Sequence, residues 1–407
     1  MDWHSEMRSA PNSVSEPPRR FKGHSNAGLL WLVIPVLLLA VACALLLSSD
    51  LFRSLERGAP PVEKLTFERT VLDQGGIHLN VRAGGSEPMT IAQVQVDEAF
   101  WQFTQTPPGD LERVTSAWLH IPYPWVRGEA HKVKVVSRLG TTFEHEIAVA
   151  VATPKPSTRE LLPQALIGAF VGILPVALGL MLFPVLRRLG DNGMSFLLAL
   201  TVGLLAFLFV DTVEDALELA GEAAAAFQGP VMVVVVALMT FLILLAIGRR
   251  HGAPMGLALA TYIALGIGLH NLGEGLAIGA AFAAGAAGLG AFLVLGFTMH
   301  NITEGIGIGA PLLRARPSLL TFVGLALLAG APAILGVWLG GLAVSPHWAA
   351  VALAVGAGSI LQVMVEVAAY LTRRGGGKVS MLTSPTVVGG TAAGIVVMYA
   401  TGIFVKI

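Results

Sequence analysis

The chain has 407 residues, of which 54% are hydrophobic and 13% are charged, and its formal net charge is +0. A soluble protein usually carries about a quarter charged residues, so the composition excludes an ordinary soluble enzyme and a disordered chain. Balanced charge gives no basic surface for nucleic acid, and the single cysteine, Cys43, excludes an intramolecular disulfide framework and a thiolate metal cluster. The class that remains is a polytopic α-helical membrane protein.

The N-terminal part of the chain divides into two segments by polarity. Residues 1–27 are polar and mildly basic, and we expect them to form a disordered cytoplasmic tail. Residues 28–49 carry no charge and are long enough for one membrane span. An uncleaved transmembrane anchor is favoured over a processed signal segment, because the apolar run exceeds the usual length of about 7–15 residues.

Residues 50–158 look soluble, and within them residues 62–156 alternate polar and apolar side chains between turns. Strands are expected at Ile77–Arg82, Thr90–Val96, Arg113–Ile121, His131–Ser137 and Phe143–Val151. This spacing predicts a small antiparallel β-sandwich outside the cytoplasm, followed by a stiff linker at residues 154–156. No catalytic constellation is visible in it, and its scattered histidines are interpreted as solvated strand residues: His78, His120, His131 and His145.

Residues 159–407 are almost continuously apolar and divide into eight segments long enough to cross a bilayer. These spans are expected near residues 161–186, 195–220, 228–248, 255–283, 288–312, 318–344, 348–372 and 383–405. Arginine and lysine fall in alternate loops, and the intervening short loops contain neither. The positive-inside rule therefore places the N-terminal tail in the cytoplasm, and the β domain and the C-terminus outside it.

Polar residues recur inside the fourth and fifth spans as the duplicated sequence His-Asn-x-x-Glu-Gly-x-x-Ile-Gly-Ala. Its polar members are His270, Asn271 and Glu274 in the first copy, and His300, Asn301 and Glu304 in the second. The spacing places each histidine and glutamate on one helix face, near the middle of the bilayer. Adjacent antiparallel helices would bring the two faces together.

The energetics of this duplication favour a bound cation. A carboxylate at mid-bilayer is expensive, and the eight spans contain no lysine or arginine that would compensate it. Imidazole and carboxylate together suit Zn²⁺ and also admit Fe²⁺, Mn²⁺ or Cd²⁺. A purely structural helix–helix hydrogen-bond pair is the competing interpretation, and the second copy makes it less favoured. The accompanying glycines are expected to allow close helix packing: Gly275, Gly279, Gly305 and Gly309.

Two further acidic features are candidates for an ion pathway. The second span of the apolar region carries a stripe of acidic residues near its outer end: Asp211, Glu214, Asp215 and Glu218. Such a stripe would collect cations, although a solvated helix end is an alternative. Glu366 lies alone inside the seventh span, with no basic residue expected at its depth, and either completes the pathway or is a packed, protonated glutamate.

The paired motifs resemble the ZIP family of divalent-metal transporters, over about residues 160–407. Members of that family carry His-Asn-x-Pro-Glu-Gly-like sequences in their fourth and fifth spans, and these form a metal site in the membrane. The family's proline is Gly273 in one motif and Thr303 in the other. The stretch 330–334 lacks the acidic residue that serves a second metal in many members. Whether the site binds one metal ion or two is therefore left open. A histidine-rich loop is reduced to His251.

The resemblance implies an importer that moves a divalent cation, Zn²⁺ first, toward the cytoplasm through the six motif residues. A transport-inactive metal sensor or partner-binding protein is the main alternative, because of the added β domain. An intramembrane metallohydrolase is disfavoured, because His-Asn-x-x-Glu is not the His-Glu-x-x-His motif. The chain is expected to be no enzyme, to need no catalytic cofactor and to lie in a bacterial inner membrane. A homodimer and the partner of the β domain are left open.

Overall fold

The computed structural model describes residues 34–35, 37–45, 62–153, 158–222, 228–250, 252–283, 287–342 and 345–406. The expected tail, the linker at residues 154–156 and His251 lie outside these ranges. Residues 34–35 and 37–45 are helical with exposed apolar side chains such as Leu38 and Leu45, as an anchor in lipid requires. Whether this segment is retained or cleaved stays a prediction.

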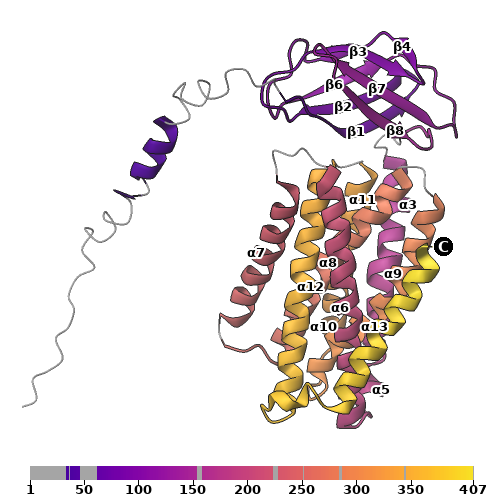
Figure 1. The fold of residues 1–407 in the computed structure, drawn as a ribbon. Coiled ribbons are helices and arrows are strands. Elements are labelled where there is room, and N and C mark those ends of the chain that lie inside the picture. The colour runs from indigo at the N-terminus through magenta and orange to yellow at the C-terminus, as the bar shows by residue number, and fades with distance from the viewer. Residues whose placement is uncertain are drawn as a thin grey trace, which may run out of the picture. The chain divides into compact units, whose positions relative to one another are not determined.

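The β domain contains two four-stranded antiparallel sheets (Figure 1). One sheet has the order β1 (Leu65–Asp73), β2 (Gly76–Ala83), β6 (Ser116–Ile121) and β5 (Thr104–Thr106). The other has the order β4 (Ala99–Trp101), β3 (Ile91–Val96), β7 (His131–Ser137) and β8 (Thr142–Ile147). The five expected strands are present. The strand expected from Arg113 begins later, because a turn precedes it in which Val114 has a φ of 66°.

A single apolar core joins the two sheets of the β domain. Alternate residues of the central strands point into it, such as Ile77 and Leu79 of β2 and Val133 of β7, and all three are fully buried. The intervening residues lie on the opposite face and are half-buried, among them His78 and Asn80. This period of two is the alternation that the sequence displays, and it confirms the small antiparallel β domain.

Helices occupy every segment of the apolar region in which a span is expected. They are α3 (Thr158–Gly168), η1 (Ala169–Ile173), α4 (Leu174–Met181), α5 (Phe183–Leu186), α6 (Asp191–Glu222), α7 (Gly229–Arg249), α8 (Gly256–Ala283), α9 (Ala287–Gly309), η3 (Ala310–Leu312), α10 (Leu319–Gly330), α11 (Pro332–Gly341), α12 (Pro346–Arg374), η4 (Val379–Met381) and α13 (Pro385–Lys406). Six helical segments are long and apolar enough to cross a membrane, and they include α6, α7, α8 and α12. The described residues do not establish this for α9 and α13.

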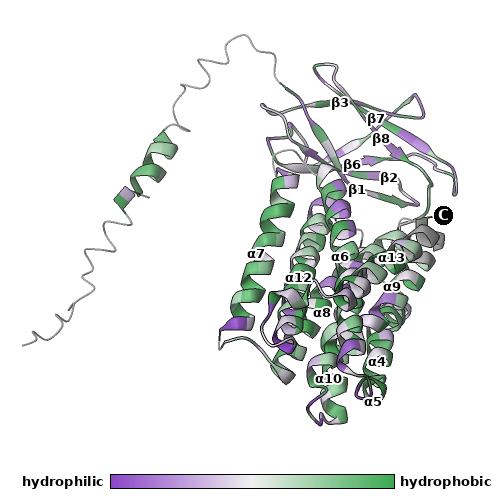
Figure 2. Ribbon diagram, turned by 60° about the horizontal axis from the view of Figure 1, so that its bottom comes forward, coloured by the Kyte–Doolittle hydropathy of each residue, from purple (hydrophilic) through white to green (hydrophobic). Residues whose placement is uncertain are grey.

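The outer surface of the bundle is apolar, as Figure 2 shows along α7. Large side chains on that helix are about half exposed, for example Val234, Leu238 and Leu242. In contrast, the central helices α8 and α12 bury about half of their residues. An apolar exterior around a buried centre is the arrangement that lipid demands of a helical membrane protein.

Two prolines interrupt the helices around the centre of the bundle. Before Pro175 the chain forms the π-helical turn η1, in which the Leu174 amide donates to the Ala169 carbonyl oxygen. Pro332 separates α10 from α11. Because proline has no amide hydrogen, each interruption frees main-chain carbonyl groups that need other donors.

Glycines permit the close approach of neighbouring helices. A Cβ atom at Gly275 of α8 would lie 2.2 Å from the Ala333 carbonyl oxygen of α11, and one at Gly279 would lie 2.2 Å from that of Val337. A Cβ atom at Gly305 of α9 would meet a carbonyl oxygen of α4 at 2.3 Å. The packing role expected for these three positions is therefore confirmed. It is wrong for Gly309, where the nearest atom would be a side-chain carbon at 3.6 Å.

Basic residues at alternate helix ends gather at one end of the bundle. An Arg374 side-chain nitrogen of α12 lies 2.5 Å from an Asp191 carboxylate oxygen at the start of α6. Arg373 donates to the Pro254 carbonyl oxygen, 3.3 Å away, in the connection between α7 and α8. Three of the four basic loops that the sequence assigned to one side are thus adjacent, while their location in the cytoplasm stays a prediction.

Candidate metal centre

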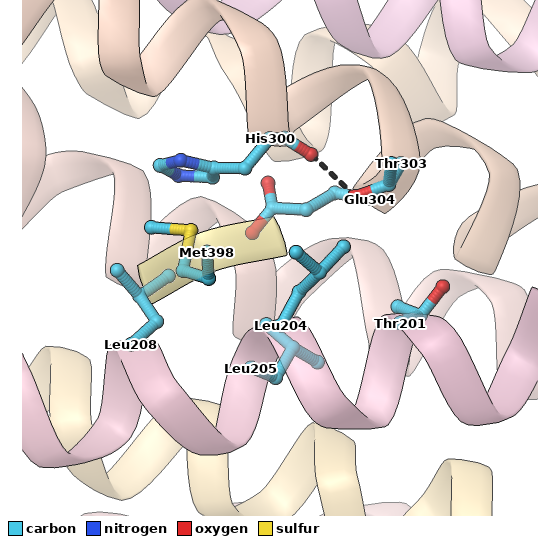
Figure 3. A pocket seen from close by; sticks show the side chains of 8 residues that line it. All are labelled: Thr201, Leu204, Leu205, Leu208, His300, Thr303, Glu304 and Met398. Carbon is cyan, nitrogen blue, oxygen red and sulfur yellow. Dashed lines mark hydrogen bonds between the residues drawn. The ribbon is translucent and has the colours of Figure 1, made fainter. Parts of the chain in front are cut away.

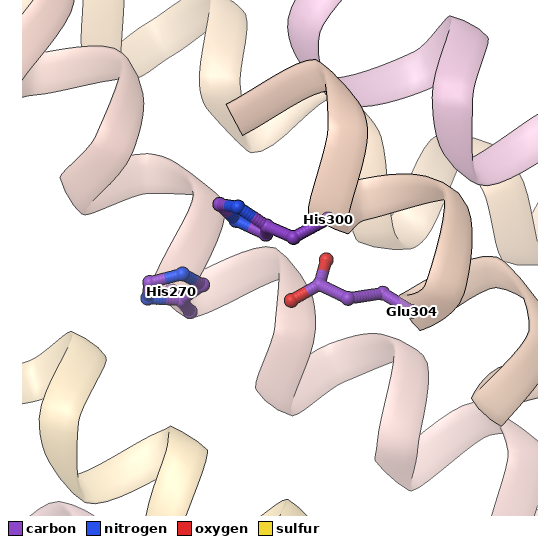
Figure 4. Close-up of side chains that lie close together, drawn as sticks. All are labelled: His270, His300 and Glu304. Atoms are coloured by element: carbon purple, nitrogen blue, oxygen red, sulfur yellow. The ribbon is translucent and has the colours of Figure 1, made fainter. Parts of the chain in front are cut away.

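The two copies of the duplicated motif face each other across α8 and α9. His270 lies at the middle of α8 and His300 just past the middle of α9, so both are at the depth expected from the sequence. The ligand atoms of His270, His300 and Glu304 all lie within 4.8 Å of one another (Figure 4). All three side chains are buried. The structure therefore brings together residues from both copies, in a group that could hold a metal ion.

Glu274 connects the two histidines. Its Oε1 atom lies 3.0 Å from Nε2 of His270, on the same helix, and 2.6 Å from Nε2 of His300, on the facing helix. Hydrogen bonds of this kind fix the orientation of both rings and raise the basicity of imidazoles that bind a metal. Glu274 can thus orient the histidines as well as contribute charge to the group.

Several polar atoms at the centre of this group have no hydrogen-bond partner within the described part of the chain. They are Nδ1 of His270 and His300, Oδ1 of Asn271 and Asn301, and both carboxylate oxygens of Glu304. Buried polar atoms nearly always have partners, and an unpartnered carboxylate in the membrane is especially costly. Each of these atoms can bind a cation through a lone pair, provided that it does not carry a proton. Their concentration in one place makes it a candidate ligand site.

The two asparagines hold the site helices against their neighbours. The Asn301 Nδ2 atom donates to the Val171 carbonyl oxygen at 3.1 Å and to the Glu274 Oε2 atom at 3.2 Å. In a regular helix, the Val171 carbonyl would accept from position 175, where proline has no amide hydrogen. Asn301 therefore donates to a carbonyl group to which Pro175 has no amide hydrogen to donate, and its own Oδ1 atom is left available at the site.

Asn271 donates to a main-chain carbonyl group near the other proline interruption. Its Nδ2 atom donates to the Ala329 carbonyl oxygen, 3.0 Å away, close to the break at Pro332. Sequence reasoning identified both asparagines but missed these main-chain acceptors. The signal was present, since each acceptor lies three or four residues before a proline.

A small space adjoins the group on the side of Glu304 (Figure 3). It is lined by Thr201, Leu204, Leu205 and Leu208 of α6, His300, Thr303 and Glu304 of α9, and Met398 of α13. Figure 3 shows the Glu304 carboxylate between the His300 ring and Met398, with Leu204 of α6 close by. This helix, which the duplicated motif did not single out, therefore forms one wall of the site.

The predicted acidic stripe continues from this wall along α6. Leu204, Leu208 and Asp211 are spaced by four and three residues, so they share one face of the helix. Asp211 lies nearly one helical turn beyond Leu208, or about 4.5 Å farther along the helix axis. Asp211 is half-buried, and Glu214 is exposed, as are Asp215 and Glu218. The stripe and the site thus belong to one face of α6.

Glu366 differs from its expected environment. Although it is completely buried on α12, the Arg249 Nε atom donates to its Oε1 atom at 3.0 Å. The statement that no basic residue lies at its depth is wrong, because Arg249 ends α7 and its long side chain extends alongside α12. The charge of Glu366 is therefore compensated by the protein, unlike that of Glu304.

The fold and the site together define a class: an α-helical membrane protein with an antiparallel β domain and a buried His/Glu group at the centre of its bundle. No protein-family model matches the chain, and no curated protein matches it.

Proposed function

We propose that the chain is a ZIP-like, eight-span transporter that moves a divalent metal cation, Zn²⁺ first, toward the cytoplasm. The observation that carries this proposal is the convergence of His270, His300 and Glu304 from two adjacent helices, at mid-depth. Their unpartnered donor atoms lie where a bilayer provides no water, so a cation there would replace its hydration shell with protein ligands.

The path for the ion runs along α6. The exposed acids at the end of this helix raise the local concentration of cations. From Asp211 the same helix face leads past Leu208 to the space beside Glu304. The leucines close this space to a hydrated ion, so entry requires α6 or α13 to move relative to α9. Fe²⁺, Mn²⁺ and Cd²⁺ have the same preference for mixed nitrogen and oxygen ligands and are the competing cargoes.

Uptake into proteoliposomes tests the proposal. Purified chain is reconstituted and supplied with each of the four metals, and the His270→Ala/Glu304→Ala variant is compared with the wild type. Glu87→Ala, which removes an exposed carboxylate of the β domain, is the matched control. We expect uptake in the wild type and the control and none in the site variant.

Three other results would contradict the proposal. Metal binding without uptake under any ionic condition would favour the alternative of a metal sensor. Equal uptake by the site variant would show that the duplicated motif is structural. Hydrolytic activity that depends on Glu304, without any metal flux, would identify a metallohydrolase instead.

A further inference from the structure

Two histidines face each other on the β domain, far from the duplicated motif in sequence. His78 of β2 and His120 of β6 are directly opposite in the antiparallel register. Their Nδ1 atoms are 2.9 Å apart, and their rings are inclined at 64°. Both lie on the half-buried face of the sheet, while their strand neighbours point into the core. The pair is thus held by two central strands and remains accessible from solvent.

Asp73 fixes the orientation of the first histidine. Its Oδ1 atom lies 2.9 Å from Nε2 of His78 and accepts from the Gly75 amide at 2.8 Å. A carboxylate at Nε2 holds the proton on that nitrogen, so a neutral His78 presents the lone pair of Nδ1 toward His120. A carboxylate bound to the outer nitrogen of an imidazole is the arrangement found around metal-ligating histidines.

The turn that carries Asp73 is built for this contact. A Cβ atom at Gly75 would lie 3.1 Å from the Asp73 Oδ1 atom and 3.4 Å from Nε2 of His78. Gly76 has a φ of 124°, and a Cβ atom there would lie 2.1 Å from the Ile121 carbonyl oxygen. Glycine is therefore required at the start of β2, and a side chain at position 75 would crowd the carboxylate of Asp73 beside the pair.

The other two histidines of the β domain lack this arrangement. His131 Nδ1 lies 2.8 Å from an Asp97 oxygen, and His145 Nε2 lies 2.8 Å from the Thr70 hydroxyl oxygen. Each is one imidazole with an oxygen partner, and neither has a second imidazole in contact among the described residues. The interpretation of all four histidines as solvated strand residues is wrong for His131, which is buried against Asp97, and incomplete for His78 and His120.

We propose that His78 and His120 bind a divalent transition-metal ion through their Nδ1 atoms, with Asp73 as a positioning residue. With metal–nitrogen bonds of about 2.05 Å, a separation of 2.9 Å between the nitrogens corresponds to a ligand–metal–ligand angle of about 90°. A tetrahedral ion would need about 3.3 Å by the same bond length. The observed separation is compatible with adjacent positions of a tetragonal ion with nitrogen and oxygen ligands, which suits Cu²⁺ or Ni²⁺; Cu²⁺ binds such ligands more tightly, with water completing its coordination.

Binding requires the rings to turn until both lone pairs face one point, and this displaces the proton that joins the two Nδ1 atoms. That proton moves to Nε2 of His120, so both imidazoles bind the ion as neutral ligands. The site does not depend on the proposed transport, since none of its residues belongs to the bundle.

Copper titration of the full chain in detergent micelles tests the site. The parent carries His270→Ala/Glu304→Ala, which removes the bundle group, and Cu²⁺ binding is followed by electron paramagnetic resonance. We expect a signal from two equatorial nitrogens that is lost in His78→Gln and in His120→Gln and kept in the matched control His145→Gln. Asp73→Asn retains both imidazoles, and we expect it to weaken binding by about 10- to 100-fold.

The thermal transition of each variant shows whether its β domain remains folded, and the wild-type bundle provides a second background. There, His78→Gln lowers the number of bound Cu²⁺ ions by one. A two-nitrogen signal that persists in both histidine variants, or its absence from the parent, would overturn the proposal. Neither result bears on the proposed transport, because the parent variant lacks the bundle group through which transport is proposed.

Discussion

The hydrogen bond between Asn301 and the carbonyl group to which Pro175 has no amide hydrogen to donate can be tested by a double-mutant cycle. Asn301→Ala removes the donor to the Val171 carbonyl oxygen, 3.1 Å away. Pro175→Ala restores an amide hydrogen at the position from which a regular helix would satisfy the same carbonyl group. The two changes therefore act on one acceptor, and their effects on the free energy of unfolding should not add.

The magnitude follows from the two hydrogen bonds that the Asn301 amide donates. Asn301→Ala leaves the Val171 carbonyl and the Glu274 Oε2 atom without this donor. Hydrogen bonds between membrane helices contribute about 0.6 kcal/mol on average and about 1.7 kcal/mol at most, so the single variant should lose about 1 to 3 kcal/mol. In the Pro175→Ala background the Val171 share disappears, and the loss should be smaller by about 0.6 to 1.7 kcal/mol.

Reversible unfolding in mixed micelles by a denaturing detergent measures the four free energies of the cycle. The matched control is Asn271→Ala, whose acceptor is the Ala329 carbonyl oxygen and is not shared with Pro175. Its effect should be the same in both backgrounds. An Asn301→Ala loss that is unchanged by Pro175→Ala would refute the reasoning, because the carbonyl would then not be the shared partner.

Three further predictions concern packing, charge and pH. Gly305→Ala places a Cβ atom at 2.3 Å from a carbonyl oxygen and should cost about 1 to 3 kcal/mol of unfolding free energy, whereas Gly309→Ala, with its nearest atom at 3.6 Å, should be neutral or stabilising in the same assay. Glu304→Gln should preserve the unfolding free energy while abolishing uptake. Glu366→Gln should cost about 1 to 3 kcal/mol of unfolding free energy, because it weakens a hydrogen bond to a charged arginine. Equal losses of unfolding free energy in the two variants would contradict the assignment of a structural role to Glu366 and a binding role to Glu304. Burial lowers the pKa of His145, so the unfolded chain binds the proton more readily, and the β domain should lose stability as the pH falls below about 6.5. His145→Phe should flatten this dependence in thermal unfolding followed between about pH 5 and pH 7.5, and an unchanged slope would refute it.

The positions of the helices and of five of the eight described strands could be predicted from the sequence because each follows from a local rule. The alternation around Ile77 and Leu79 describes a strand with one buried face, and the run from residue 229 to 249 is apolar almost throughout, as a lipid-facing helix requires. The start of β6 could not be predicted, since it depends on the positive φ of Val114, which is not a residue that favours such a turn.

The candidate site could be predicted as far as its spacing allows. Positions i and i+4 place His270 and Glu274 on one face, and the structure shows them in contact. The partner of Glu366 could not be predicted, because Arg249 is at a helix end in sequence and reaches the buried carboxylate only through the packing of α7 on α12. The prediction of close packing at Gly309 is wrong for the same reason. Spacing by four residues places glycines on one helix face, but the neighbouring helix decides which part of that face is crowded.

The charge of the buried group favours a divalent ion in the proposed transport. Glu274 and Glu304 supply two negative charges when both bind, and the described residues offer the group no lysine or arginine comparable to the one beside Glu366. A divalent cation with neutral histidines makes the group electrically neutral, which is the least costly state at the middle of a bilayer. A monovalent ion would leave one negative charge, and a trivalent ion would leave one positive charge. Replacing one carboxylate by an amide therefore shifts the charge balance toward monovalent ions, so Glu304→Gln should bind Zn²⁺ more weakly, measured by calorimetry, even where the fold is intact.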